Sequence, residues 1–334
     1  MRHPLLCFCA VLLFCACNRT NNTAYILEQG TRFHTYYHIT YKSNRSLSDA
    51  IDSTMSAFNA SLNPFDSTTL ISRINRNETD SLDHMLYEVI QTSLKVSEAT
   101  NGMYDITGAP LFDLWGFGTK KGVTRYASQQ EVDSIKTFVG YQYLQVDSGR
   151  LQKKDPRMRL NPSSLSKGYV TDLVAKTLEN HGVYDYMVEI GGEMVCSGKN
   201  PLGECWQIGV NKPIENNKEV INVVAYKVPI CSKSGLATSG DYRNYKDLPD
   251  GRRVAHTINL KTGYPSHQNI LSATVIAPTC MEADAWATAF MSLGMDATKR
   301  LLEQHPELNV LLVYTTPNGG VHTYTHGVAY KEIE

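Results

Sequence analysis

The order of helix-like and strand-like segments is the feature of this chain that most limits its fold. β-Rich runs and amphipathic helices follow one another without the strict strand–helix alternation of a doubly wound parallel sheet. This order favours an α+β fold in which a sheet and helices are combined in one domain. Because no repeat, low-complexity stretch or linker divides the body of the chain, we expect one large domain over residues 25–334.

Hydrophobic periodicity and helix-end signals place the main elements. Residues 33–41 alternate as in a half-buried strand, and two capping boxes, Ser128–Glu131 and Thr279–Glu282, mark helix starts. Helices are expected over residues 48–62, 82–99, 128–140, 167–181 and 279–293. Further strands are expected over residues 187–190, 206–210, 220–230, 271–276 and 310–314.

Composition excludes two classes of protein. The chain has 334 residues, of which 42% are hydrophobic and 19% charged, and a disordered protein would be far less apolar. Its 32 Lys and Arg residues balance 33 Asp and Glu residues, for a formal net charge of -1. Without a basic excess, we expect no nucleic-acid partner.

The N-terminus has the features of a targeting segment. The apolar run Leu5–Ala16 is too short to span a bilayer and has the length of a signal-peptide core. Ala16 followed by Cys17 resembles a bacterial lipobox, although Phe14 is not the usual aliphatic residue. We therefore expect a signal peptide over residues 1–16, a lipidated Cys17 and a tether over residues 17–24. The alternative is ordinary cleavage and release of the chain.

The later cysteines leave two interpretations open. Cys196, Cys205, Cys231 and Cys280 are scattered and show no C-x-x-C spacing, which argues against a zinc or thioredoxin-type motif. They could form bridges in an oxidising compartment, but their connectivity cannot be read from sequence. They could equally be small buried hydrophobic residues.

Asp284 and Thr288 form the first candidate site. They are four residues apart in a predicted helix, so both side chains leave the same face. A carboxylate and a hydroxyl at that spacing can share a hard cation such as Mg²⁺. The alternative is an Asp that the helix dipole favours in the first turn, with Thr288 incidental.

Two more segments have features of a ligand site. Ser163–Tyr169 is a small-residue turn into a helix, where free backbone N–H groups and Lys167 would suit a phosphate. It lacks the Walker A pattern, and N-capping explains its serines equally well. Gly191-Gly192-Glu193 follows a predicted strand, and glycine there permits either a tight turn or close approach of a ligand.

Histidine and aromatic residues supply further candidates. His256 lies in a β-like run and could act as a general base, although a lone histidine is more often structural. Aromatic side chains at Phe65, Tyr104, Trp115 and Phe117 could enclose a planar ring, with core packing as the alternative.

Taken together and in order, these segments resemble the ApbE family, the FAD:protein FMN transferases. The resemblance covers nearly the whole chain after the predicted tether, from about Gln29 onward. The segments that carry it are Leu70-Ile71-Ser72-Arg73-Ile74-Asn75, Tyr104-Asp105-Ile106-Thr107 with Leu114-Trp115-Gly116-Phe117-Gly118, Ser166-Lys167-Gly168-Tyr169, Ile190-Gly191-Gly192-Glu193, Thr238-Ser239-Gly240-Asp241-Tyr242-Arg243, His256-Thr257-Ile258-Asn259 before Thr262-Gly263, and Ala283-Asp284-Ala285 with Ala287-Thr288.

The resemblance implies a T-fold-like domain and a specific reaction. Such an enzyme requires Mg²⁺, works outside the cytoplasm, often as a lipoprotein, and cleaves the FAD pyrophosphate. It transfers FMN to a Thr or Ser hydroxyl of an acceptor flavoprotein and releases AMP. The acceptor is typically a subunit of a membrane redox complex or an extracytoplasmic flavoprotein.

The resemblance also assigns roles by position. It implies that Asp284, Thr288 and the carbonyl of Ser164 bind the metal, and that His256 is the base on the acceptor hydroxyl. Contacts to FAD are implied for Gln29, Phe65, Met103, Tyr104, Asp105, Asn161, Lys167 and Ile258.

This chain departs from the family pattern at several of these positions. Phe65 stands where Tyr is common, Gln29 where Met is frequent, and Asn161 where Asp is frequent. Ser163 and Ser166 replace the commoner Gly or Ala. We expect these changes to affect FAD affinity and the balance between transfer and hydrolysis more than the reaction class.

Other functions fit parts of the same pattern. An FAD pyrophosphatase would share the metal site and use water in place of the acceptor hydroxyl, giving FMN and AMP. A non-catalytic FAD-binding lipoprotein would bind the cofactor without needing Asp284 or His256. A generic solute-binding lipoprotein would not need the Asp284 and Thr288 pair.

Overall fold

The computed structural model describes residues 23–119, 125–211, 224–240, 245–248, 251–255, 257–266 and 268–333. The predicted signal peptide, the lipidation site Cys17 and the candidate base His256 lie outside the described residues.

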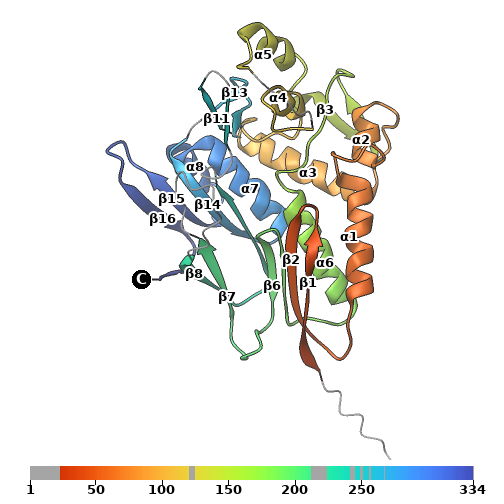
Figure 1. The fold of residues 1–334 in the computed structure, drawn as a ribbon, viewed down its shortest axis with the longest axis vertical. Coiled ribbons are helices and arrows are strands. Elements are labelled where there is room, and N and C mark those ends of the chain that lie inside the picture. Colours follow the sequence, from red (N-terminus) through yellow and green to blue (C-terminus); the bar gives the residue numbers. More distant parts are fainter. Residues whose placement is uncertain are drawn as a thin grey trace, which may run out of the picture.

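The centre of the molecule is an eight-stranded sheet in which every neighbouring pair of strands is antiparallel (Figure 1). In spatial order its strands are β1 (Ala24–Arg32), β2 (Thr35–Ser43), β5 (Tyr186–Ile190), β6 (Glu193–Ser197), β9 (Ser234–Gly240), β14 (Ile270–Ala277), β15 (Asn309–Thr315) and β16 (Val321–His326). The helices fall between these strands in the chain without regular alternation, so the predicted α+β class is confirmed.

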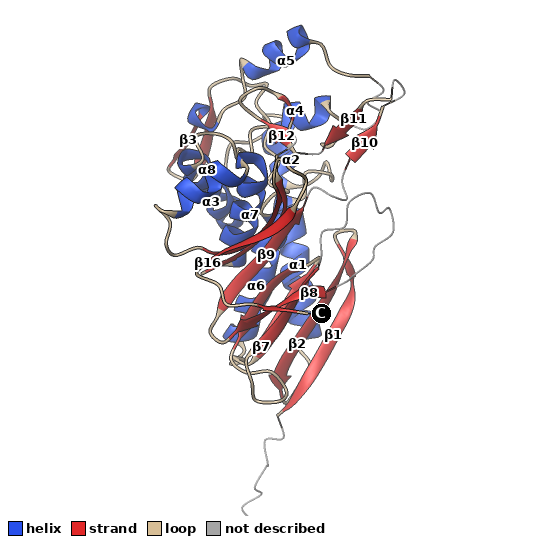
Figure 2. Ribbon diagram, turned by 90° about the vertical axis from the view of Figure 1, so that its left-hand side faces the viewer, coloured by secondary structure: helices blue, strands red, loops and turns tan. Residues whose placement is uncertain are grey.

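Helices cover one face of this sheet (Figure 2). The helices are α1 (Ser48–Leu62), α2 (Leu70–Asn75), α3 (His84–Ala99), α4 (Ala109–Leu114), α5 (Gln129–Lys136), α6 (Ser166–Asn180), α7 (Cys280–Leu293) and α8 (Met295–Leu302), with a 3₁₀ turn over Tyr141–Tyr143. Helix α6 contacts β5 and β6, and α7 contacts β9 and β14. Helices α1 and α3 then pack on α6 and α7, so the main core lies between the sheet and these helices.

A small sheet packs against the other face of β6, β9 and β15. Its strands are β7 (Trp206–Asn211), β8 (Val224–Ile230) and β17 (Lys331–Glu332), in the order β17-β8-β7. Trp206, Ile208 and Val228 from this sheet share a second core with Leu236 and Val313. A disulfide joins Cys205, just before β7, to Cys231, just after β8, whereas Cys196 and Cys280 are buried thiols. The later cysteines therefore divide between the two interpretations left open by the sequence.

An upper lobe packs around a third core (Figure 1). It contains α4, α5 and two hairpins, β10 (Tyr245–Asp247) with β11 (Arg253–Ala255) and β12 (Ile258–Asn259) with β13 (Tyr264–Pro265). Trp115 is buried there, and its ring N–H donates to the carbonyl of Gly263 at 2.8 Å. A separate hairpin, β3 (Leu144–Asp147) with β4 (Arg150–Lys153), lies beside α2 and α3.

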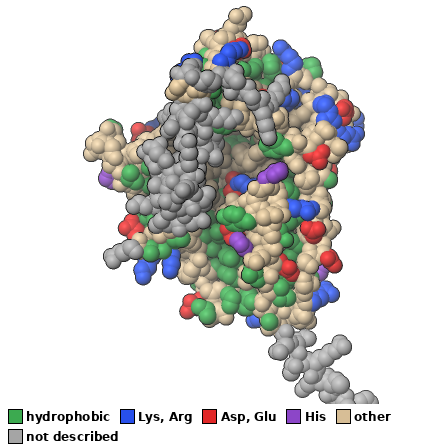
Figure 3. All heavy atoms as spheres, viewed as in Figure 1, with side chains coloured by type: hydrophobic (Ala, Val, Ile, Leu, Met, Phe, Trp, Pro, Cys, Tyr) green, Lys and Arg blue, Asp and Glu red, His purple; other side chains and the backbone are tan. Residues whose placement is uncertain are grey.

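The distribution of charged side chains on the surface is consistent with the formal net charge of -1. On the described residues of the face in Figure 3, acidic and basic side chains are interspersed without a continuous basic area. None of the helices in the described part of the chain combines the length and apolar character needed to cross a membrane.

The expected helices begin within two residues of the observed ones, whereas the helix expected over residues 128–140 ends at Lys136. Helix α7 begins after Thr279 and ends before Gly294, as predicted, although only the capping box at Ser128 is formed in both directions. The strand expected over residues 33–41 begins at Thr35, because Phe33 and His34 form a turn with positive φ. Strand β1, which the sequence analysis did not predict, precedes that turn.

Candidate functional site

A cavity of about 540 Å³ opens between the upper lobe and the helix-covered part of the main sheet. Nine of the twelve residues named from the sequence line it, although they come from segments far apart in the chain. These nine are Met103, Tyr104, Asp105, Asn161, Ser164, Lys167, Ile258, Asp284 and Thr288. The size of the cavity is in the range typical of small-molecule sites.

The expected metal ligands converge at one end of this cavity. Asp284 and Thr288 lie one turn apart on α7, and Asp284 is only 3% exposed. The Thr288 hydroxyl lies 3.4 Å from the carbonyl oxygen of Ser164, in the turn before α6, and 3.3 Å from the hydroxyl of Ser239 on β9. Carboxylate, hydroxyl and carbonyl oxygens are the donors that Mg²⁺ prefers, so the donor chemistry fits this ion.

The described residues contain no cluster of three or more His, Cys, Asp and Glu side chains that could hold a metal. The site expected here is of another type, because it has a single carboxylate. Mg²⁺ usually keeps several waters or phosphate oxygens in its shell, so one carboxylate with two neutral oxygens is a reasonable protein contribution.

Close contact between α6 and α7 places Asp284. The backbone N–H of Gly168 donates to Asp284 Oδ2 at 3.1 Å. A Cβ at Gly168 would stand 2.2 Å from the carbonyl oxygen of Cys280, so only glycine permits this approach. Asp172, one turn further along α6, accepts N–H bonds from Cys280 at 2.9 Å and Met281 at 2.8 Å. It thereby satisfies free N–H groups at the start of α7.

Lys167 brings a positive charge to the same end of the cavity. Its ammonium is ion-paired with Glu193, the first residue of β6. Burial acts to lower the pKa of Lys167, but the charges of Asp284 and Glu193 outweigh it and raise that pKa. Lys167 is therefore charged at neutral pH and available to a phosphate.

At the two carboxyl groups beside Lys167, burial outweighs the nearby positive charge, and both pKa values are raised. Burial raises the pKa of Glu193; the Lys167 ammonium offsets part of this rise and the charge of Asp284 adds to it. Burial likewise raises the pKa of Asp284, against the ammonium of Lys167 and the Gly168 N–H bond. Without a further positive charge, ionising both carboxyl groups costs free energy. A bound cation would favour their ionised forms.

Buried polar residues fix the cavity wall around Tyr104. The Ser164 hydroxyl donates to the Tyr104 hydroxyl at 3.0 Å. Asp105 accepts backbone N–H bonds from Thr107 at 2.8 Å and Tyr141 at 2.5 Å, and burial raises the pKa of Asp105 to about 6. These contacts hold the Met103–Asp105 segment in place.

Asn161 shapes the loop that leads into α6. Its side-chain oxygen accepts from the backbone N–H of Ser163 at 3.0 Å and from the Ser163 hydroxyl at 2.6 Å. Its own backbone N–H donates to Ile106 at 2.8 Å, which ties the loop to the Tyr104 segment. The Ser163 hydroxyl, absent in Gly or Ala, thus contributes to loop geometry.

The upper lobe supplies the apolar part of the cavity. Phe112 and Phe117 near α4, with Ile258 and Leu260 of the β12 hairpin, line that side. Thr257, which follows the undescribed His256, also lines it. An apolar wall opposite a charged floor suits a ligand with a flat ring at one end and phosphates at the other.

Two of the expected FAD contacts lie outside the cavity lining. Gln29 is exposed on β1, paired with His38 of β2. Phe65 is 60% exposed on the loop between α1 and α2. Their proposed contacts with FAD stay predictions.

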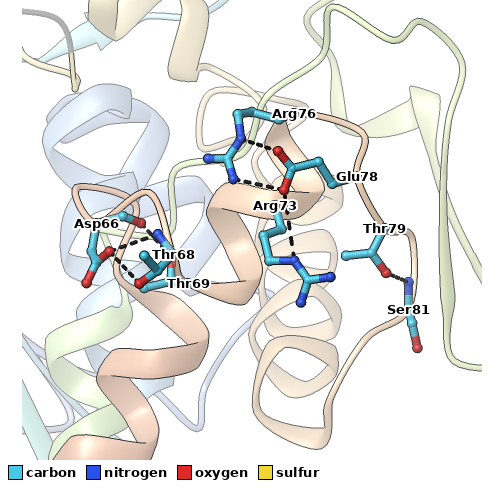
Figure 4. A network of polar contacts seen from close by, with 8 residues as sticks. All are labelled: Asp66, Thr68, Thr69, Arg73, Arg76, Glu78, Thr79 and Ser81. Atoms are coloured by element: carbon cyan, nitrogen blue, oxygen red, sulfur yellow. Dashed lines mark hydrogen bonds and ion pairs between the residues drawn. The ribbon is translucent and has the colours of Figure 1, made fainter.

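Polar contacts connect residues of the loop that carries Phe65 (Figure 4). Asp66 accepts from the backbone N–H and the hydroxyl of Thr68 at 2.8 and 2.7 Å, and the Thr69 hydroxyl donates to the carbonyl of Asn63. On the far side of α2, Arg76 pairs with Glu78 at 2.7 Å. The exposure of Phe65 therefore results from a defined loop geometry.

The structure adds residues to which the sequence analysis gave no role. Glu193, Ser239, Met291 and Ser292 all line the cavity. The last two could have been found from periodicity, because they follow Thr288 by three and four residues on the same helical face. The pairing of Glu193 with Lys167 has no local signal in the sequence.

Comparisons with known proteins identify the family of this chain. Residues 33–312 match the model of the ApbE family. The chain is 32% identical over 313 residues to the FAD:protein FMN transferase of Escherichia coli K12, covering 88% of each chain. It is 31% identical over 325 residues to that of Haemophilus influenzae, covering 93% of this chain and 92% of the relative.

Solved structures show the same fold. The flavin transferase ApbE from Vibrio cholerae superposes with a TM-score of 0.80 at 27% identity, covering 91% of this chain and 98% of the other. The ApbE protein from Thermotoga maritima superposes with a TM-score of 0.75 at 25% identity, covering 90% of this chain and 96% of the other.

Proposed function

This chain belongs to the ApbE family, and from that membership we infer that it is an FAD:protein FMN transferase. Its substrates are FAD and a protein acceptor. The observation that carries this inference is the single cavity that gathers Lys167, Asp284, Thr288 and the Tyr104 segment from distant parts of the sequence. Relatives named for this activity span nearly all of the chain.

The transfer is a substitution at phosphorus. The hydroxyl oxygen of an acceptor Thr or Ser forms a bond to the phosphorus of the FMN half of FAD. The anhydride bond to the AMP half breaks, and AMP leaves with that bridging oxygen. The hydroxyl proton passes to a base. Negative charge shifts from the pyrophosphate to the leaving AMP during the reaction. Lys167, which lines the cavity, neutralises part of this charge.

We propose that Mg²⁺ assists this reaction, held by Asp284, Thr288 and the carbonyl of Ser164. When bound there it would supply a Lewis acid to the phosphate oxygens. Support comes from the convergence of three oxygen donors at the cavity floor and from the burial of Asp284, which disfavours a bare carboxylate. The N–H bond from Gly168 holds the carboxylate in one orientation.

We propose His256 as the base that accepts the hydroxyl proton. Imidazole titrates near neutral pH, which suits this role. The support is its position in the chain, immediately before Thr257 and Ile258, both of which line the cavity. Proton transfer of this kind typically contributes about 10²–10⁴-fold to a rate.

We also propose that the protein works outside the cytoplasm, anchored to a bacterial membrane through a lipid on Cys17. The apolar run before Cys17 supports this location. The Cys205–Cys231 disulfide adds support, because such bonds persist mainly in oxidising compartments.

The first experiment follows both products of the reaction. The soluble body, from Asn18 onward, would be incubated with FAD, Mg²⁺ and a peptide that contains a candidate acceptor Thr or Ser. Release of AMP together with an FMN-sized mass gain on the peptide is the expected result. Asp284→Ala should abolish both, whereas the matched control Asp296→Ala, at an exposed position on the next helix, should leave both unchanged.

The same assay tests the alternatives. AMP and free FMN with an unmodified peptide, repeated across acceptor sequences, would mean that water is the natural acceptor and that the protein is an FAD pyrophosphatase. Bound FAD that stays intact in the presence of Mg²⁺ and acceptor would mean a carrier without transferase activity.

A further inference from the structure

Lys167 is under the influence of two carboxylates but forms an ion pair with only one of them. Its ammonium forms the ion pair with Glu193 on β6, while Asp284 on α7 is close enough to act on it electrostatically. Asp284 is the one carboxylate among the expected metal ligands. A lysine that paired with Asp284 would compete directly with a cation for that carboxylate.

The backbone around Glu193 fixes its position, and the burial of its carboxylate costs folding free energy. It follows the two-residue turn Gly191-Gly192, both with positive φ, and pairs with Ile190 across the hairpin. Its side chain is only 4% exposed, and its Oε2 atom has no hydrogen-bond partner among the described residues. A buried carboxylate with one unsatisfied oxygen destabilises a fold, so its presence at the cavity indicates a role there.

We propose that Glu193 is a positioning residue that holds the ammonium of Lys167 away from Asp284, and so leaves Asp284 free to bind the divalent cation. This inference rests on the proposed metal site. The lysine stays close enough to meet the pyrophosphate, since its side chain is 40% exposed on the cavity side. Glu193 thus lets one small space hold both a lysine and a metal ion.

The geometry explains why a neutral residue would fail at this position. Lysine has a flexible four-carbon stem, so without a charged partner its ammonium turns to the nearest remaining carboxylate. Gly168, the next residue, is bonded to Asp284 through its backbone, so the base of the lysine cannot move away from α7. Asp284 would then be the available partner.

A double-mutant cycle on cation affinity tests the proposal. Binding of Mn²⁺, as a probe for Mg²⁺, would be measured by calorimetry for the wild type, Glu193→Gln, Lys167→Met and the double variant. Glu193→Gln should weaken Mn²⁺ binding by about tenfold or more in the wild-type background, through the added competition of Lys167. In the Lys167→Met background the same change should cost no more than about threefold, since only the charge of Glu193 is lost.

A matched control separates this effect from a general loss of a buried ion pair. Glu179, at the other end of α6, pairs with Lys233 at 2.7 Å and is 14% exposed. Glu179→Gln should leave Mn²⁺ affinity unchanged. If Glu193→Gln fails to fold, the comparison of Lys167→Met with the double variant still tests the proposal, because a loss of more than about threefold there would mean that Glu193 acts without Lys167.

Three outcomes would overturn the proposal. Equal losses in both backgrounds would mean that Glu193 acts without Lys167. An unchanged affinity in Glu193→Gln would mean that it has no role in cation binding, and no Mn²⁺ binding to the wild type would remove the metal site. Because the readout is binding, it is independent of whether the wild type transfers FMN.

Discussion

Replacing Gly168 by alanine tests the contact on which the site depends. The added Cβ would stand 2.2 Å from the carbonyl oxygen of Cys280 and 2.9 Å from Cβ of Asp284, whereas real Cβ contacts are essentially never below 3.0 Å. The nearest clashing atom belongs to backbone, so no side-chain rotation can relieve it. Helices α6 and α7 must therefore separate by most of an ångström.

The expected cost follows from this separation. Overpacking of a tight core contact typically costs about 1–3 kcal/mol, and a clash with backbone belongs at about 3 kcal/mol. For a domain of this size that corresponds to a fall in Tm of about 5 °C. The same shift moves Asp284 relative to Ser164, and a misplacement of about 1 Å at a reacting site costs about 100-fold in rate.

Thermal unfolding and the AMP-release assay measure the two effects separately. Gly182→Ala is the matched control, because Gly182 ends the same helix, has φ of +78° and has nothing within 4 Å of its added Cβ. It should cost about 1 kcal/mol from backbone strain and leave the rate of AMP release unchanged. A Gly168→Ala protein with the Tm and rate of the wild type would refute the argument that glycine is needed for this approach.

Four further changes have defined outcomes. Asp284→Ala should lower Mg²⁺-dependent AMP release by at least about 100-fold, and retained activity would place the metal site elsewhere. His256→Ala should slow flavinylation by about 10²–10⁴-fold with little change in FAD affinity, so a loss confined to affinity would remove its role as base. Cys17→Ala should move the protein from the membrane to the soluble fraction, and unchanged fractionation would contradict lipidation. Replacing both Cys205 and Cys231 by serine should cost about 3.5 kcal/mol in denaturant unfolding, as the loss of a cross-link with a sequence separation of 26 predicts, and equal midpoints would contradict this.

Local rules were sufficient for the part of the site on α7. The residue before the helix, Thr279, and the glycine after it, Gly294, define both ends through capping chemistry that acts within a few residues. Helical spacing then puts Asp284 and Thr288 on one face, and the structure has both in the cavity. Inferences that depend on a single helical turn need no knowledge of the rest of the fold.

Strand β1 shows where local rules fail. Residues 24–32 have only weak alternation, and Phe33 and His34 take positive φ without the Asn-Gly or Gly-Gly signal of a hairpin. The strand exists because its backbone pairs with β2 over nine residues. That pairing is a tertiary contact, so the sequence analysis left the segment without an element and assigned residue 24 to the tether.

The ion pairing at the charged end of the cavity also depends on tertiary contacts that the local sequence does not predict. This pairing matters for function. Lys167 and Glu193 are 26 residues apart, and Gly168 and Asp284 are 116 apart, so nothing in the sequence indicates which carboxylate takes the lysine. The choice is made by the Gly191-Gly192 turn, which fixes Glu193, and by the α6–α7 contact, which fixes Asp284. Since burial penalises each carboxylate, ionising both is favourable only when two positive charges are present. Lys167 supplies one of them, and we expect the bound divalent cation to supply the rest, so that both carboxylates are ionised when the cation is bound.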